Sequence, residues 1–298
     1  MHKFLRAVGF SQYTEKKQVQ KLIRDIIIHA DERSYTTVGK KTLVAEFDRN
    51  FAEDIGIGVC GEFDEDDTYS FDYYLPYLRS DLVSTAEDIS IERHAAKESY
   101  AGICDDPKVG VSLIFYLQNM ISYLKLQGEG KIPAKGTSLN LSALSCQGTI
   151  MMPIQKTEWQ KKKIAKDAVQ RNRLIQAARG GDEEAMESLT LEDMDTYTSI
   201  SRKIQKADIF SLVDTYFMPY GVECDQYSII GNILSVNLVA NDLTNEEIYR
   251  LRIECNDMIF TIAINKADLL GEPAPGRRFK GQIWMQGIAD FGVNDMLY

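Results

Sequence analysis

The last third of the chain changes from helical to strand-like patterning, and this change limits the available folds more than any other feature. Past residue 226, short runs rich in β-branched and aromatic residues alternate with Asn, Asp and Gly turn signals. Four or five strands in about seventy residues predict a small closed or half-open barrel of OB-like size. The runs are residues 227–240, 248–254, 258–265 and 278–287.

The middle of the chain, residues 155–207, has helical composition throughout. Gly180 and Gly181 are expected to end its first helix, because glycine accepts the left-handed cap conformation. Two shorter helices, 182–189 and 192–204, are expected to follow, with acidic residues near their N-termini that favour the helix dipole.

The first half mixes both patterns. Residues 14–30 carry apolar side chains at helical spacing, and a second helix is expected over 111–126. Strand-like runs occupy residues 42–47, 55–63, 69–77, 89–93, 99–104 and 138–154. We therefore predict an α+β protein with a mixed α/β N-terminal domain (1–154), a helical linker segment (155–207) and a small OB-like β-barrel domain (208–298).

The net charge of −10 arises in one place. Residues 51–100 carry thirteen acidic and three basic side chains, so the other residues sum to zero. The acidity centres on residues 62–67, where a hairpin turn is expected. Such a cluster could hold a hard cation such as Ca²⁺, but it lacks the alternating ligands and glycine of an EF-hand, and a solvated turn is favoured. The overall charge does not support a general nucleic-acid surface.

The expected compartment is the cytoplasm, with no membrane association. No apolar stretch follows the basic residues Lys3 and Arg6, so a secretory signal is not expected. No run approaches the roughly 18 apolar residues of a membrane span. The five cysteines are scattered, which fits reduced, mostly buried thiols.

Two nucleotide-binding motifs occur without their structural context. Residues 56–61 match GxGxxG, but acidic residues follow where a phosphate-binding helix should begin, so the glycines indicate a bulged or tightly packed strand. Residues 265–268 match NKxD, but no phosphate loop accompanies them, and a polar turn after a strand is favoured.

The sequence nominates no catalytic residue, metal ligand or cofactor. The three histidines, His2, His29 and His94, are far apart and belong to no zinc or nucleophile motif. The remaining candidate is a basic strand with a tryptophan, a combination that single-strand binders use for charge and stacking. Its residues are Arg277, Arg278, Lys280 and Trp284. The alternative is a structural edge strand whose tryptophan is covered.

Three long phrases carry a resemblance over the whole chain. They are LTLEDMDTYTSISRKI (189–204), DIFSLVDTYFMPYGVECDQYSIIG (208–231) and INKADLLGEPAPGRRFKGQIWMQG (264–287). With the opening MHKFLRAVGFS, they resemble a domain-of-unknown-function family of hypothetical proteins from anaerobic Gram-positive bacteria. The resemblance implies a soluble bacterial protein, and it carries over no catalytic residue because none is assigned in that family.

Three functions remain open. The leading hypothesis is a soluble, cytoplasmic, non-enzymatic binding or scaffold protein, because no nucleophile, base or metal set is assembled. A protein partner or a second copy of the chain is favoured over nucleic acid. The alternatives are single-stranded nucleic-acid binding through the barrel and an enzyme with an unrecognised carboxylate site.

Overall fold

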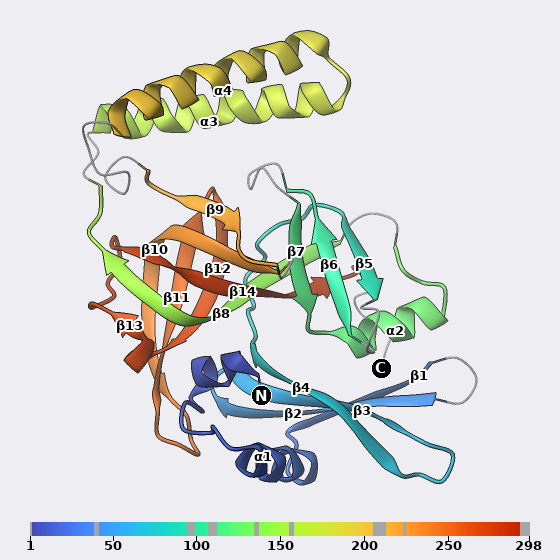
Figure 1. Cartoon of the computed structure of the whole chain (residues 1–298). Helices are drawn as coiled ribbons and strands as arrows, with labels where there is room; N and C mark the ends of the chain where they lie inside the picture. The colour runs from blue at the N-terminus through green and yellow to red at the C-terminus, as the bar shows by residue number, and fades with distance from the viewer. Residues whose placement is uncertain are drawn as a thin grey trace.

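The computed structural model describes residues 2–38, 42–93, 99–106, 112–133, 137–154, 158–204, 213–222 and 225–292. It has a mixed architecture in which strands predominate over helices. A four-stranded sheet and a ten-stranded sheet lie side by side, and a pair of helices stands beyond the second sheet (Figure 1). No helix in the described part of the chain has the length and apolarity that a membrane crossing requires.

The four-stranded sheet is an antiparallel meander. Its strands are β1 (Glu32–Val38), β2 (Thr42–Ala52), β3 (Ile55–Phe63) and β4 (Tyr69–Leu78). The helix α1 (Lys16–Ile28) packs on β2 and β3 through the apolar stripe that the sequence predicts, and η1 (Lys3–Val8) precedes it. The sequence does not predict β1, whose side chains are exposed or half-buried and which gains its structure from pairing with β2.

A closed five-stranded barrel forms the centre of the molecule. Around the barrel the order is β8, β12, β11, β10 and β14, and β14 pairs back to β8. The strand β8 lies within the residues assigned to the N-terminal domain, so the barrel joins distant parts of the chain. The strands are β8 (Ser138–Met151), β10 (Gln226–Ala240), β11 (Glu247–Cys255), β12 (Met258–Asn265) and β14 (Arg278–Asp290).

Beyond the barrel, β14 pairs in parallel with β7 (Leu113–Leu117). The sheet continues through β6 (Tyr100–Cys104) and β5 (Ile89–Arg93), two expected strands that pair antiparallel. The expected helix over 111–126 is wrong in its first half, because Leu113 and Phe115 are fully buried in a strand that β6 and β14 flank. Two short strands extend the sheet elsewhere: β9 (Tyr216–Pro219) on β10 and β13 (Leu269–Leu270) on β8.

Two helices, α3 (Glu158–Arg179) and α4 (Glu183–Ile204), form an antiparallel hairpin at the edge of the molecule (Figure 1). Gly181 makes the turn with φ +88°, as the sequence predicts. Instead of two short helices, α4 is one continuous helix. Thr190, near the expected break, donates its hydroxyl to the carbonyl of Met186 and leaves the helix intact.

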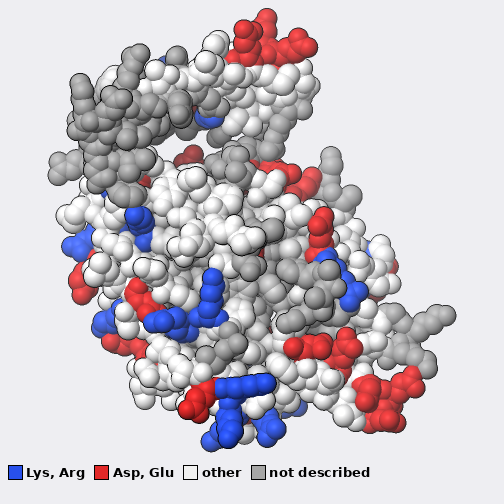
Figure 2. Space-filling view, viewed as in Figure 1, with Lys and Arg blue, Asp and Glu red and all other residues white. Residues whose placement is uncertain are grey.

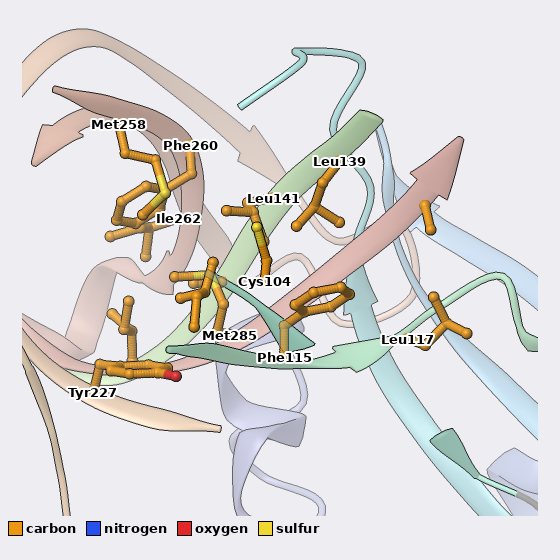
Figure 3. Close-up of a cluster of buried hydrophobic side chains, with 14 of the residues drawn as sticks. Cys104, Phe115, Leu117, Leu139, Leu141, Tyr227, Met258, Phe260, Ile262 and Met285 are labelled. Carbon is orange, nitrogen blue, oxygen red and sulfur yellow. The ribbon is translucent and has the colours of Figure 1, made fainter. Parts of the chain in front are cut away.

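Two hydrophobic clusters use the two faces of the barrel strands. One fills the barrel interior and continues under β7 and α2 (Met120–Gly128), as Figure 3 shows for Tyr227, Phe260 and Phe115. The other joins the outer barrel face to η1, α1 and the four-stranded sheet, and it includes Trp284. The N-terminal unit therefore covers one side of the barrel.

Candidate functional site

The basic strand lies on the covered side. Trp284 is 5% exposed, and its ring lies 5.1 Å from the ring of Phe4 and 4.8 Å from that of His2. Its indole N–H donates to Asp225 at 2.6 Å. The ring is therefore not free to stack on a base.

The basic side chains of this strand differ in burial. Arg278 is 4% exposed, and its guanidinium donates to the carbonyls of Met152 and Val213. Arg277 and Lys280 are half-buried. The structure thus does not assemble the four sequence candidates into one exposed patch.

The glycines at 56–61 belong to a tightly packed strand, as the sequence indicates. A Cβ at Gly56 would lie 2.3 Å from the carbonyl oxygen of Arg49, and one at Gly61 would lie 2.2 Å from that of Ser70. The pairing of β3 with β4 is also irregular beside Gly61. A side chain at either position would therefore clash with the neighbouring strand.

The NKxD residues form a polar turn after β12. Asn265 accepts a hydrogen bond from the backbone N–H of Ala267 and so begins the 3₁₀ turn η2 (Lys266–Asp268). Lys266 pairs with Glu247, and Asp268 pairs with Arg6. The Asp268–Arg6 pair fastens the N-terminal segment to the barrel, whereas the Lys266–Glu247 pair joins η2 to β11.

The acidic turn between β3 and β4 is exposed, as predicted, and appears at the lower right of Figure 2. Asp64 accepts backbone hydrogen bonds from Asp66 and Thr68, which is the usual role of an aspartate in a turn. Within the described chain, no group of three or more acidic, histidine or cysteine side chains has the arrangement of a metal site.

The histidines and cysteines that the structure describes do not form a site. His2 lies among aromatic rings, and His29 ends α1. Cys60, Cys104 and Cys255 are buried free thiols, and Cys146 is half-buried and free. His94 and Cys224 lie outside the described residues.

The structure does contain a site that the sequence did not reveal. Glu46 and Asp48 alternate on β2, so both side chains leave the same face of the sheet, and each residue is only 8% exposed. They line a cavity of about 200 Å³ beside Gln118 and Asn119, which precede α2. Arg79 and the exposed Glu32 border the same cavity.

A glycine of the GxGxxG match makes space for this carboxylate pair. Gly58 on β3 lies opposite Asp48 on β2, and Cys60 lies opposite Glu46. A Cβ at Gly58 would lie 2.6 Å from Asp48 Oδ1 and 3.3 Å from Glu46 Oε1. An acid-x-acid pair opposite a glycine on the next strand is the sequence signal that would have located the site.

Burial determines the protonation of the pair. Removal from water raises the pKa of Asp48 to about 6, although the paired Arg79 guanidinium works in the opposite direction. Burial, and then the charge of Asp48, hold the pKa of Glu46 well above its usual range. In the described chain, the hydrogen-bond partner of Glu46 is the thiol of Cys60, at 3.7 Å, which is a weak donor.

Two buried acceptor atoms on residues that line this cavity have no hydrogen-bond donor within the described residues. They are Asp48 Oδ1 and Gln118 Oε1. The orientation of the Gln118 amide is fixed, because its N–H groups donate to the carbonyl of Leu78 at 2.9 Å and to Gln286 Oε1 at 2.8 Å. Buried acceptors without donors are costly, so each calls for an explanation in terms of structure or ligand.

The architecture is thus a closed barrel joined to a covering sheet, with a polar cavity at the inner face of that sheet. The chain belongs to the family described as "Domain of unknown function, E. rectale Gene description (DUF3881)", whose model matches residues 5–287. This finding confirms the resemblance seen in the sequence. Comparison with curated proteins and with solved structures finds no match.

Proposed function

We propose that this protein is a non-enzymatic binding protein and that its ligand site is the Glu46–Asp48 cavity. The observation that carries the proposal is a pair of buried acceptors, Asp48 Oδ1 and Gln118 Oε1, which have no donors in the described chain and belong to residues that line one cavity. A ligand with hydrogen-bond donors would offset the desolvation of both atoms.

The cavity size limits the ligand. A volume of about 200 Å³ corresponds to about six or seven waters at roughly 30 Å³ each. Drug-sized molecules take sites of roughly 300–1,000 Å³, so the ligand is a smaller molecule. The exposed side chains of Glu32 and Ser122 at the cavity border indicate access from solvent.

The barrel that supports the site is OB-like in this proposal. In an OB barrel, a three-strand meander pairs in parallel with the fifth strand, and its first strand pairs with the fourth. Here the meander is β10, β11 and β12; β12 pairs in parallel with β8, and β10 pairs with β14. The pairing corresponds to an OB barrel with its last strand moved to the beginning.

The face that OB barrels use for oligonucleotides is the surface of the second and third strands, here β11 and β12. Ile248 on β11 and Ala263 on β12 lie in the same buried cluster as Phe4 and Leu5 of η1. The N-terminal segment η1 thus covers part of this face, mainly along β12. We therefore favour a small ligand over single-stranded nucleic acid.

The cellular setting in this proposal is the cytoplasm, which the free thiols of the described chain favour. A protein partner remains part of the proposal, because α4 exposes Met186, Leu191 and Met194. Exposed apolar groups of this kind are common at docking surfaces.

The proposal is tested by screening small polar metabolites with the purified chain and measuring its melting temperature. A true ligand raises the melting temperature of the wild type and fails to do so for Asp48→Asn. Asp66→Asn, which removes the same charge from the exposed β3–β4 turn, serves as the matched control and should respond like the wild type. If no compound produces an Asp48-dependent shift, the proposed site is wrong.

An enzyme is the second candidate, because a carboxyl whose pKa is about 6 can exchange protons near neutral pH. The two candidates separate once a ligand is found. A binding protein returns the ligand unchanged after prolonged incubation, whereas an acid–base enzyme converts it and loses this activity in Glu46→Gln.

A further inference from the structure

We infer that the occupant of the Glu46–Asp48 cavity is a small organic cation with an ammonium or guanidinium group. The inference rests on the proposed function and adds the chemical class of the ligand. The cationic group would donate hydrogen bonds to Asp48 Oδ1 and Gln118 Oε1, the two buried acceptors without donors in the described chain.

The charge balance of the cavity favours a cation over an anion. Three carboxyl groups, Glu32, Glu46 and Asp48, line it together with one guanidinium, that of Arg79. That guanidinium is already held by ion pairs to Glu32 at 3.0 Å and to Asp48. An anionic ligand would therefore meet carboxylates and an engaged arginine, and like charges at close range repel strongly in a buried site.

The donor set also favours an organic cation over a metal ion. Calcium takes about 6–8 oxygen ligands, and magnesium requires nearly octahedral geometry. The described chain contains no metal-like group of three acidic, histidine or cysteine side chains. Ammonium and guanidinium groups need fewer acceptors and donate in defined directions.

The cavity wall provides a place for a short carbon stem. Ile121 of α2, which is 3% exposed, and Ile288 of β14, which is half-buried, line the cavity with the polar groups. A cationic head among carboxyl groups and a short alkyl stem against isoleucine describe a small alkylammonium or alkylguanidinium.

Binding of a cation should release a proton from the carboxyl pair. A nearby positive charge favours the ionised form, and the pKa of both carboxyls is raised in the folded chain. The other titratable or charged groups that act on Glu46 come from β1, β3, both ends of β4, the residue after β4, and β7. They are Glu32, Cys60, Tyr69, Tyr77, Arg79 and Tyr116. The affinity for the cation should therefore rise with pH.

The test uses two probes of nearly identical shape, methylguanidinium and neutral N-methylurea, in calorimetric titrations of the full chain. Methylguanidinium should bind about tenfold or more tightly than N-methylurea. Its affinity should increase between about pH 5 and 8, with net proton release measured in buffers of different ionisation enthalpy. Propylammonium and acetate provide a second cation and an anion.

Three variants assign the binding to the cavity. Asp48→Asn should weaken methylguanidinium binding by about tenfold or more, and Glu46→Gln should reduce the proton release. Asp66→Asn, at the exposed turn, should bind like the wild type. Far-ultraviolet circular dichroism checks that each variant folds.

The possible outcomes separate this inference from the proposed function. Asp48-dependent binding of N-methylurea or acetate without binding of either cation overturns the cation assignment and leaves a small-molecule site. Asp48-dependent binding of Mg²⁺ or Ca²⁺ alone overturns it in favour of a metal. If no probe binds, and metabolite screening also gives no Asp48-dependent shift, both the inference and the proposed function are wrong.

Discussion

Two regions bury polar side chains to a similar degree but differ in how these side chains are satisfied. On the outer face of β14, Arg278 donates to two backbone carbonyls and Trp284 donates to Asp225. On the inner face of β2, Asp48 keeps one buried oxygen without a donor from the described chain, and Glu46 has a weak thiol partner. Satisfied buried groups point to a structural role, whereas unsatisfied acceptors in a cavity point to a ligand.

The largest expected loss of stability is at Trp284, because its satisfied hydrogen bond indicates a structural role. Trp284→Ala removes the ring contacts with Phe4 and His2 and the hydrogen bond to Asp225, and should lower the unfolding free energy by about 3–5 kcal/mol. Urea denaturation measures the change. The other tryptophan, Trp159, is 69% exposed, and Trp159→Ala should cost less than about 0.5 kcal/mol. If both variants lost the same unfolding free energy, the structural role of Trp284 would be contradicted.

A smaller loss is expected at Arg278. Arg278→Met keeps much of the side-chain volume but removes the donors to the carbonyls of Met152 and Val213, at a cost of about 1–3 kcal/mol. The neighbouring Arg277→Met should cost less, since Arg277 is more exposed and donates to one carbonyl, that of Glu272. Chemical denaturation of both variants provides the comparison. If the strand instead bound single-stranded nucleic acid, the wild type would bind DNA or RNA in a salt-dependent way. Arg278→Met would then lose this binding.

The carboxyl pair should make the folded chain less stable as the pH rises. The folded state holds the Asp48 proton more tightly than the unfolded chain does, because the pKa rises from 3.8 to about 6. The stabilisation is complete below about pH 4 and is lost between about pH 4 and 6, at about 1.4 kcal/mol per unit of pKa shift. The shift of Glu46 has the same sign.

Glu46→Gln isolates this effect. Because it removes one of the two titrating groups, the variant should gain stability relative to the wild type as the pH rises from 4 to neutral. Urea denaturation across this pH range measures the difference, and Asp66→Asn is the exposed control. The difference in unfolding free energy between variant and wild type should change with pH. If it stays constant, the carboxyl of Glu46 titrates normally.

The smallest effect is expected at the acidic β3–β4 turn. Joint replacement of Asp64, Glu65 and Asp66 by their amides relieves repulsion between exposed charges and should leave stability within about 0.5 kcal/mol of the wild type, or slightly higher. Thermal melts are sufficient for this comparison. A clear decrease in melting temperature would instead reveal a bound cation and place this turn alongside the cavity as a functional site.

Local patterning predicted the elements whose stability depends on near neighbours. The stripe of α1, the turn at Gly181 and the strands after residue 226 follow from helical period, glycine conformation and strand-turn alternation. The glycines at 56–61 were also interpreted correctly, because acidic residues follow them where a phosphate-binding helix would begin.

Long-range contacts decided the rest. The start of the expected helix at 111–126 became β7 because β6 and the distant β14 pair with it, and β8 closes a barrel with strands more than seventy residues away along the chain. The surroundings of Trp284 depend on Phe4 and His2 at the opposite end of the chain. Local periodicity contains no information on such partners.

The sequence by itself determined an acidic α+β chain of a recognisable family, with a C-terminal series of strands and no standard catalytic or metal motif. Only the tertiary structure decided which polar residues serve structure and which line a site. The reason is physical: exposure, pKa and hydrogen-bond satisfaction belong to a side chain in its surroundings. For Trp284 and Asp48, those surroundings come from segments far away in the chain.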